Sequence, residues 1–378
     1  MEVSVDNLIQ WINHSGLFQK DGENKGGVHS YFDQNSSKFG FLYPEITGYF
    51  INSQRFLYKI TDDKQLIDNA VLSSEWLIKI YEKHGGIVQG INTDNSRGNL
   101  VYSFDTAVCA NAFLDSYILS QNEKYLNFAK LLSNWIMDNA IESNGTLKPY
   151  KNLDSDNFEE STDLWYKQKG CFHIKTVIPL IKLYKITNDE SYLKKSELIC
   201  STYNNYKKPD GSLTLHSNNT IIHLHSLCYA LEGLLHCYSA TKNEQYLTNC
   251  FECLNWCENK IIDDGSTELW YNSKFEHAKT SYHIAQLIRL MIIVDLAKNT
   301  NNYSNSINKL SSFLSIFQAK NDDARINGGF YEEYYKTLFG WKLRKRVNSW
   351  SSFFSLQAKY WENNKDSLSF QDEIEFLF

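Results

Sequence analysis

One short pattern recurs along this 378-residue chain and restricts its fold more than any other feature. An apolar run ends in Tyr-x-x-Thr or a close variant, a second helical run follows that usually ends near a Trp, and a glycine-containing turn comes next. The anchors of successive copies lie 54 to 67 residues apart, at Tyr58, Tyr117, Tyr184, Tyr238 and the degenerate Asp295. Internal similarity at such a period indicates a repeat architecture in which each copy holds two helices and their loops.

A sixth copy is divided between the two ends of the chain. The run 347–361 supplies one half, and residues 5–13, followed by Gly26 and Gly27, supply the other. A closed ring removes the exposed ends that an open solenoid must cap. We therefore predict an all-α fold, an (α/α)6 toroid of six helical hairpins with minor β-hairpins in its loops. The N- and C-terminal helices would close the sixth hairpin, and residues 1–378 would form a single domain; an open solenoid is the alternative.

Composition and charge exclude several classes of protein. The net charge is −6 and the only basic cluster, at 342–346, is too short for a nucleic-acid surface. No apolar run reaches the roughly 18–20 residues of a membrane span, and the first residues lack the features of a signal peptide, so we expect a cytoplasmic protein. The eight cysteines are then expected to be buried thiols. No sequence feature indicates an oligomeric state.

The first helix of each hairpin should line the inside of the ring, and each begins with a polar or aromatic residue. These residues lie 10 to 13 positions before the anchors and are Glu45, Asp105, His173, His225, His283 and Trp350. In a ring they would share one end of the central cavity, where helix N-termini favour anionic groups. A few polar groups in an aromatic concavity are typical of a small-molecule site.

Two kinds of chemistry fit these residues. Glu45, Asp105 and Glu332 are candidate acids and bases for hydrolysis of a glycosidic bond, although Glu45 and Asp105 also suit helix capping. The histidines His173, His225 and His283 are candidates for moving a proton at a sugar carbon, because a histidine near a helix N-terminus tends to be neutral. The spacing matches no compact metal site, so we predict neither a metal nor a cofactor.

A further set of residues is expected to bind the substrate. Aromatic side chains would stack on sugar rings, and basic ones would pair with a uronate carboxylate. The predicted set is Tyr31, Tyr43, Tyr49, Arg97, Lys175, Trp270, Glu332, Arg344 and Trp350.

The repeated hairpins and their Asp-Gly turns resemble those of the (α/α)6-toroid carbohydrate enzymes. That group includes unsaturated glucuronyl hydrolases, N-acylglucosamine 2-epimerases and the helical domain of glucuronyl C5-epimerases. The segments 43–49, 104–106, 225–234 and 347–350 are similar to uncharacterised proteins of polysaccharide biosynthesis clusters. The resemblance implies the fold and a saccharide substrate. It implies no catalytic residue, because the paired Asp of the hydrolases and the Arg-rich start of the 2-epimerases are missing.

The sequence therefore favours an enzyme that acts on an oligo- or polysaccharide by general acid/base chemistry, either as a glycoside hydrolase or as a sugar epimerase or lyase. The expected partner is a saccharide, with no nucleic acid and no membrane span. One alternative is a non-catalytic saccharide-binding or scaffold protein. Another is an isoprenoid cyclase, whose apolar cavity and Asp-rich clusters are poorly matched here.

Overall fold

The Tyr-x-x-Thr pattern forms a helix C-cap and the turn that follows it. In the computed structural model, which describes residues 3–91, 98–274 and 278–378, helix α2 (Pro44–Thr61) ends at Asp62. Asp62 has a left-handed backbone, with φ of 55°, and donates its N–H to the carbonyl of Tyr58. The Thr61 hydroxyl donates to the Leu57 carbonyl and accepts the N–H of Asp63. The pattern thus satisfies the last carbonyls of one helix and sets the direction of the next.

Residues Phe18–Ser30, Phe41–Asn204 and Phe378 form one compact unit, called unit 2 here. Its described helices make three contacting pairs, and α5 also packs against α2 and α7. The first helix of each pair is buried along most of its length, as expected for a helix with neighbours on all sides. The remaining elements are α3 (Gln65–His84), β3 (Leu100–Tyr102), α5 (Ser103–Ser120), α6 (Glu123–Trp135), η1 (Ile136–Ala140), β4 (Tyr150–Asn152), β5 (Asn157–Glu159), η2 (Trp165–Lys167), η3 (Cys171–Thr176), α7 (Val177–Thr187) and α8 (Glu190–Ser201).

Residues Met1–Leu17, Tyr31–Gly40 and Asn205–Leu377 form the other compact unit, unit 1, and the chain passes between the units within α9 (Tyr203–Tyr206). Three helix pairs are again in contact: α10 with α11, α12 with α13, and α1 with α14. The helices are α1 (Val5–His14), α10 (Leu224–Thr241), α11 (Glu244–Glu258), α12 (Ser281–Lys298), α13 (Ser304–Leu314), η4 (Ser315–Phe317), α14 (Ser349–Asn364), η5 (Lys365–Ser367), α15 (Phe370–Glu373) and η6 (Ile374–Phe376).

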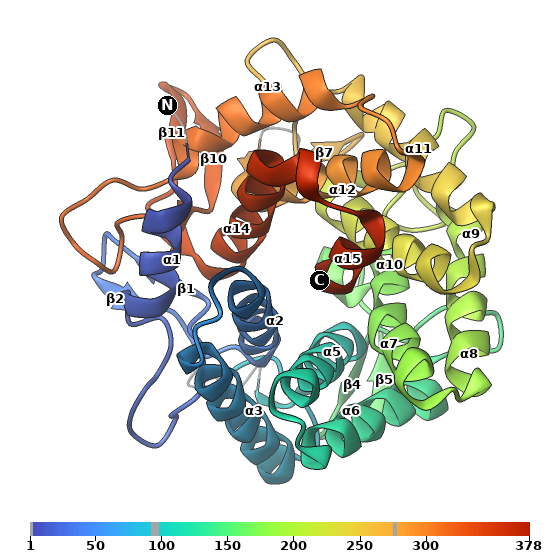
Figure 1. Cartoon of the computed structure of the whole chain (residues 1–378). Coiled ribbons are helices and arrows are strands. Elements are labelled where there is room, and N and C mark those ends of the chain that lie inside the picture. The colour runs from blue at the N-terminus through green and yellow to red at the C-terminus, as the bar shows by residue number, and fades with distance from the viewer. Residues whose placement is uncertain (1–2, 92–97, 275–277) are drawn as a thin grey trace. The chain divides into compact units, whose positions relative to one another are not determined.

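The strands of unit 1 are short and antiparallel. They are β1 (Tyr31–Asp33), β2 (Lys38–Phe39), β6 (Ile222–His223), β7 (Trp270–Tyr271), β8 (Ala278–Thr280), β9 (Phe330–Tyr331), β10 (Glu333–Thr337), β11 (Gly340–Leu343) and β12 (Arg346–Asn348). Strands β10 and β11 form a hairpin beside β8, and in unit 2 β4 and β5 form another. These confirm the predicted minor β-hairpins (Figure 1). The expectation of one domain over residues 1–378 stays a prediction.

The split sixth hairpin is confirmed within unit 1. Helix α1, near the start of the chain, packs against α14, near its end. The Trp11 indole donates a hydrogen bond of 2.9 Å to the carbonyl of Arg325, and Ser4 and Gln318 exchange two hydrogen bonds through the Ser4 backbone. Strand β1 also pairs with β12 in register, Tyr31 opposite Asn348. Segments more than 300 residues apart therefore complete one hairpin.

The repeated glycine turns allow the chain to touch the backbone of another hairpin's helix. Gly328 has a φ of +91°, and a Cβ added there would lie 2.2 Å from the backbone oxygen of Asn7 in α1. The same close approach, at 2.2 to 2.3 Å, occurs at the glycines of three other turns: Gly26 against Leu72, Gly145 against Leu198 and Gly265 against Lys309. The periodic glycine therefore reflects both a positive φ and direct contact between backbones.

The glycine contact can be tested by comparing two alanine substitutions. Gly340 also has a positive φ, of +102°, but a Cβ there would meet nothing within 4 Å. We predict that Gly328→Ala lowers the free energy of unfolding by about 1–3 kcal/mol more than Gly340→Ala, because only the former adds overpacking to backbone strain. Urea unfolding of both variants measures the difference. Equal losses would show that the contact with α1 contributes nothing.

The chemistry of the chain agrees with a buried helical core. All eight cysteines are buried thiols, three of them on one face of α11. In the part of the chain that the structure describes, no helix combines the length and apolar character required to cross a membrane.

Candidate functional site

The residues predicted at the starts of the first helices mostly lie there. Glu45, Asp105, His225, His283 and Trp350 occupy the first turns of α2, α5, α10, α12 and α14 respectively. His173 differs, because it lies in the 3-10 segment η3 and α7 begins only at Val177. Pro179 explains the difference: its ring would clash with the carbonyl of Lys175, so the α-helix cannot extend back through that residue.

Unit 2 brings two predicted carboxyl groups together around one tyrosine. The Tyr43 hydroxyl is hydrogen-bonded to the side chains of both Glu45 and Asp105, and it also contacts Gln89. Tyr49, one turn further along α2, provides a second hydrogen bond to Glu45. Glu45 is 8% exposed and Asp105 is 4% exposed. Two carboxyl groups that reach the same phenol oxygen are near neighbours in a site with little water.

Burial makes both carboxyl groups hold their protons more strongly. It raises the pKa of Glu45 to about 7, although hydrogen bonds from Tyr43 and Tyr49 and the charge of Lys175 partly oppose the rise. Burial also raises the pKa of Asp105 well above its usual range, and the charge of Glu45 raises it further. Both groups therefore keep a proton to a higher pH than an exposed carboxyl group does, and Glu45 exchanges its proton near neutral pH. Such a pair can divide the roles of acid and base.

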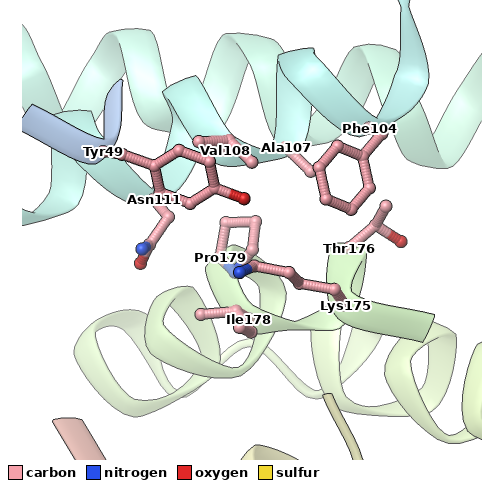
Figure 2. Close-up of a pocket in the computed structure, with 9 residues that line it drawn as sticks. All are labelled: Tyr49, Phe104, Ala107, Val108, Asn111, Lys175, Thr176, Ile178 and Pro179. Atoms are coloured by element: carbon pink, nitrogen blue, oxygen red, sulfur yellow. The ribbon is translucent and has the colours of Figure 1, made fainter. Parts of the chain in front are cut away.

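A small pocket adjoins this cluster, between α5 and the η3–α7 segment (Figure 2). Tyr49 belongs to both, since it lines the pocket and hydrogen-bonds to Glu45. The Lys175 Nζ lies 4.9 Å from the centre of the Tyr49 ring. The lining residues are Tyr49, Phe104, Ala107, Val108, Asn111, Lys175, Thr176, Ile178 and Pro179.

Two buried oxygens at this site have no hydrogen-bond partner among the described residues. They are Asp105 Oδ2 and Asn111 Oδ1. A buried polar atom left without a partner costs free energy, so its presence in a folded protein requires an explanation. A bound hydroxyl-rich ligand would supply the missing donors, and Asn111 lines the pocket.

Unit 1 holds a second arrangement, built around His225. The Glu232 carboxylate, fully buried, accepts a hydrogen bond of 3.2 Å from Gln286 Nε2 and lies 3.5 Å from Arg289 Nη1. This fixes the Gln286 amide with its oxygen toward His225, 2.5 Å from Nδ1. Because an amide oxygen only accepts, Nδ1 of His225 donates this hydrogen bond. The contact fixes the orientation of the His225 ring.

Aromatic side chains surround His225. Its ring centre lies 4.3 Å from that of Tyr229 and 4.6 Å from that of Tyr282, and Trp350 follows 6.1 Å from Tyr282. Burial raises the pKa of Tyr282, and the charge of Glu332 raises it further. Burial also raises the pKa of Glu332, with Arg344 opposing the rise.

The other two predicted histidines, His283 and His173, are held by hydrogen bonds within the fold. His283 Nδ1 contacts the Thr280 hydroxyl at 2.6 Å and backbone N–H in a capping box, while Nε2 contacts the Thr267 hydroxyl at 2.8 Å. Both ring nitrogens are therefore engaged. Burial lowers the pKa of His283 to about 3, and it does the same for His173, whose Nε2 donates to the carbonyl of Gln168. Neutral, buried rings of this kind suit packing and capping.

The remaining predicted substrate-binding residues are distributed over separate places. Trp270 stacks on His223 at 4.1 Å. Tyr31 lies under Arg346, with 4.6 Å from the guanidinium to its ring centre, and Arg344 pairs with Glu333 at 2.7 Å. Arg97 lies outside the described residues.

Sequence reasoning did not find Gln286, Glu232, Asn111 or Tyr282. Gln286 and Glu232 are polar residues inside the apolar stretches of α12 and α10, and both are fully buried. A polar residue inside an apolar helical run could have indicated them, because a buried polar group requires a hydrogen-bonding partner.

The comparisons with known proteins identify the fold. No family model matches the chain, and no curated protein sequence matches it either. Cellobiose 2-epimerase from Bacillus thermoamylovorans is similar in structure, with a TM-score of 0.77, 13% sequence identity and coverage of 95% of this chain and 96% of that one. D-mannose isomerase is also similar, with a TM-score of 0.76, 11% sequence identity and coverage of 95% of this chain and 96% of that one. An unsaturated glucuronyl hydrolase specific for heparin has a TM-score of 0.70 and 10% sequence identity, with coverage of 97% of this chain and 98% of that one.

These similar structures are (α/α)6-toroid enzymes, and the chain has that fold. The fold class predicted from the repeat is thereby confirmed. At 10–13% identity the likeness extends to the fold alone, so the reaction must be argued from the chain's own side chains.

Proposed function

We propose that this protein is a carbohydrate-active enzyme that hydrolyses a glycosidic bond in an oligo- or polysaccharide. The observation that carries the proposal is the Tyr43-bridged pair of Glu45 and Asp105, both buried and both with a raised pKa. Paired carboxyl groups in different protonation states are what glycoside hydrolysis requires. A protein that only binds saccharides has no need of two buried carboxyl groups with raised pKa values.

The two carboxyl groups divide the roles of acid and base. Asp105, whose pKa is raised by burial and by the charge of Glu45, donates its proton to the glycosidic oxygen as the bond to the anomeric carbon breaks. Glu45, with a pKa of about 7, accepts a proton from the water that attacks this carbon. Tyr43 is hydrogen-bonded to both groups and provides a path that returns the proton from Glu45 to Asp105.

The surroundings of the pair support a saccharide substrate. The pocket combines apolar walls with Asn111 and Lys175, and the orphaned Asn111 oxygen accepts from a hydroxyl. The similar structures belong to proteins whose names state a sugar substrate: cellobiose, mannose or an unsaturated glucuronide. Lys175 would pair with a carboxylate if the substrate carries a uronate. A cytoplasmic role in polysaccharide biosynthesis, with no nucleic-acid partner, remains a prediction from the sequence.

The hydrolytic function is tested by release of reducing ends. The purified protein is incubated with neutral, uronate-containing and acetamido-sugar oligosaccharides, and new reducing ends are measured. Wild type should release them from one class, and Asp105→Asn should lower the rate by about 10²- to 10³-fold, since it cannot donate the proton. The exposed Glu82→Gln serves as the control and should retain the wild-type rate. An Asp105→Asn variant with full activity would remove the carboxyl pair from the mechanism.

Sugar epimerisation or isomerisation is the second candidate, and the Gln286 contact favours it. His225 is oriented by the hydrogen bond from Nδ1 to Gln286, and its ring would remove a proton from a carbon next to a carbonyl group. Tyr229, Tyr282 and Trp350 would cover the sugar ring.

The role of Gln286 can be separated from simple packing. If the protein exchanges a sugar-carbon proton with solvent, Gln286→Met should lower that exchange by about 10- to 100-fold, because the orientation of the His225 ring is no longer fixed. Deuterium incorporation into the sugar, followed by NMR, measures the exchange. Gln286→Glu should restore part of it, since its carboxylate can still accept from Nδ1–H. Equal rates in wild type and Gln286→Met would assign Gln286 to packing only.

A further inference from the structure

The hairpin of β10 and β11 carries two large apolar side chains that the fold leaves in water. Leu338 and Phe339, adjacent at the tip, are 100% and 91% exposed. The next most exposed large apolar residue in the described ranges is Ile262, at 51%. Single exposed apolar residues are ordinary, but two neighbours that are almost completely exposed at a protruding tip are not.

The turn that carries Leu338 and Phe339 is held in place by defined contacts. Tyr334 and Trp341 stack across the hairpin with ring centres 5.3 Å apart and planes 19° apart. The Thr337 hydroxyl donates to the Gly340 carbonyl at 2.7 Å and accepts the N–H of Phe339 at 3.2 Å. Strand β10 also pairs with β8, so the base of the hairpin is anchored in a three-stranded sheet. The turn therefore presents its two apolar side chains in a defined place.

The hairpin and the three residues that follow it are together basic, whereas the chain as a whole is acidic. Residues 333–346 contain five basic residues and one acidic residue, and the chain carries a net charge of −6. Arg344 pairs with Glu333, and Arg346 pairs with Asp33. The excess positive charge lies on three exposed lysines: Lys336, Lys342 and Lys345. An apolar tip flanked by lysines complements a surface that is anionic outside and apolar beneath.

We propose that this hairpin docks the protein on an anionic lipid bilayer, with Leu338 and Phe339 inserted below the headgroups and the lysines against the lipid phosphates. A bilayer needs no complementary pocket, so two side chains at a tip are enough for contact. A second copy of this hairpin would bring like charges together, which disfavours self-association. Binding through so small an apolar contact is weak and reversible, and it depends on anionic lipid. The inference does not rest on the hydrolytic function.

Sedimentation with vesicles tests the proposal. The full chain is mixed with vesicles of phosphatidylcholine alone, or with vesicles in which about one lipid in three is phosphatidylglycerol. The second composition gives a strongly negative surface. Wild type should sediment with the anionic vesicles and not with the neutral ones. Leu338→Ser/Phe339→Ser should weaken binding about tenfold or more, and Lys336→Gln/Lys342→Gln/Lys345→Gln should remove the dependence on anionic lipid.

A matched control uses exposed apolar residues elsewhere. Ile262→Ser/Ile316→Ser removes two side chains that are 51% and 49% exposed, and this variant should bind as wild type does. The proposal is overturned if wild type stays in solution with anionic vesicles or if the tip variant binds equally well. It is also overturned if light scattering shows a wild-type dimer that the tip variant dissociates, because the tip would then be an interface between copies.

Discussion

Glu45→Gln should strongly lower turnover and at the same time stabilise the folded protein. Turnover is expected to fall by about 10²- to 10⁴-fold, because the amide cannot accept a proton from water. Stability is expected to rise because the buried carboxylate, which costs free energy once ionised, is replaced by a neutral group of the same shape. At pH 8 we expect a gain of about 1–3 kcal/mol in the free energy of unfolding.

The sign of the pH dependence follows from the raised pKa. The folded state holds the Glu45 proton up to a pKa of about 7, whereas the unfolded chain releases it near the ordinary value of 4.5. The folded state therefore binds more protons in this window, and wild-type stability falls as the pH rises through it. Urea unfolding at pH 5 and pH 8 should show the fall in wild type and a smaller one in Glu45→Gln. The exposed Glu82→Gln should behave as wild type, and an identical fall in both variants would contradict a buried Glu45 with a raised pKa.

Asp115→Ala should give one of the largest losses of stability of any single substitution in unit 2. Asp115 accepts hydrogen bonds from Lys182 at 2.9 Å, Arg55 at 2.7 Å and Asn52 at 2.7 Å. The side chains of Asp115 and Lys182 are each only 3% exposed. Removing the carboxylate leaves a buried ammonium without its counter-ion, which we expect to cost about 3–5 kcal/mol. Chemical denaturation at pH 7 measures the loss.

The charges around Asp115 also set its pKa and the effect of removing both partners. Burial by itself would raise the pKa of Asp115, but the charges of Lys182 and Arg55 outweigh it and lower the pKa below its usual value. The stability that this group contributes is therefore present above the unfolded pKa of 3.8 and lost as the pH falls through the folded value. Asp115→Leu/Lys182→Met, which removes both charges, should recover at least part of the loss of Asp115→Ala. A double variant that is no more stable than Asp115→Ala would indicate that lost packing, not an uncompensated charge, causes the effect.

The fold was predictable because its signals repeat along the chain. The Tyr-x-x-Thr pattern encodes a cap made by Thr61 and its counterparts with carbonyls four residues earlier, as at Thr187 and Thr241. The glycine turns encode a positive φ and a backbone contact at fixed places in each copy. The cap depends only on neighbours in sequence, and the glycine contact recurs at the same place in each copy, so a single chain displays both signals several times.

The site was predictable only in part, since it depends on which side of a helix each residue occupies. Distance from the anchor placed Glu45 and Asp105 in first turns, but it could not show that Tyr43 bridges them. The same distance selected His283, whose ring nitrogens are both engaged by threonines. His173 was expected in an α-helix, and Pro179 instead keeps it in a 3-10 segment. Gln286 was missed because its partner His225 lies 61 residues away in sequence.

Binding of a saccharide beside the carboxyl pair tests the central claim most directly. Asp105→Asn should retain the pocket without turnover, so its melting temperature is measured against neutral, uronate-containing and acetamido-sugar oligosaccharides. One class should raise it by several degrees, because a ligand that binds only the folded state stabilises it. Adding Asn111→Leu, which removes the orphaned oxygen from the pocket, should reduce that shift by half or more. If no saccharide raises the melting temperature, or if the shift is unchanged by Asn111→Leu, the site proposed here is not where a sugar binds.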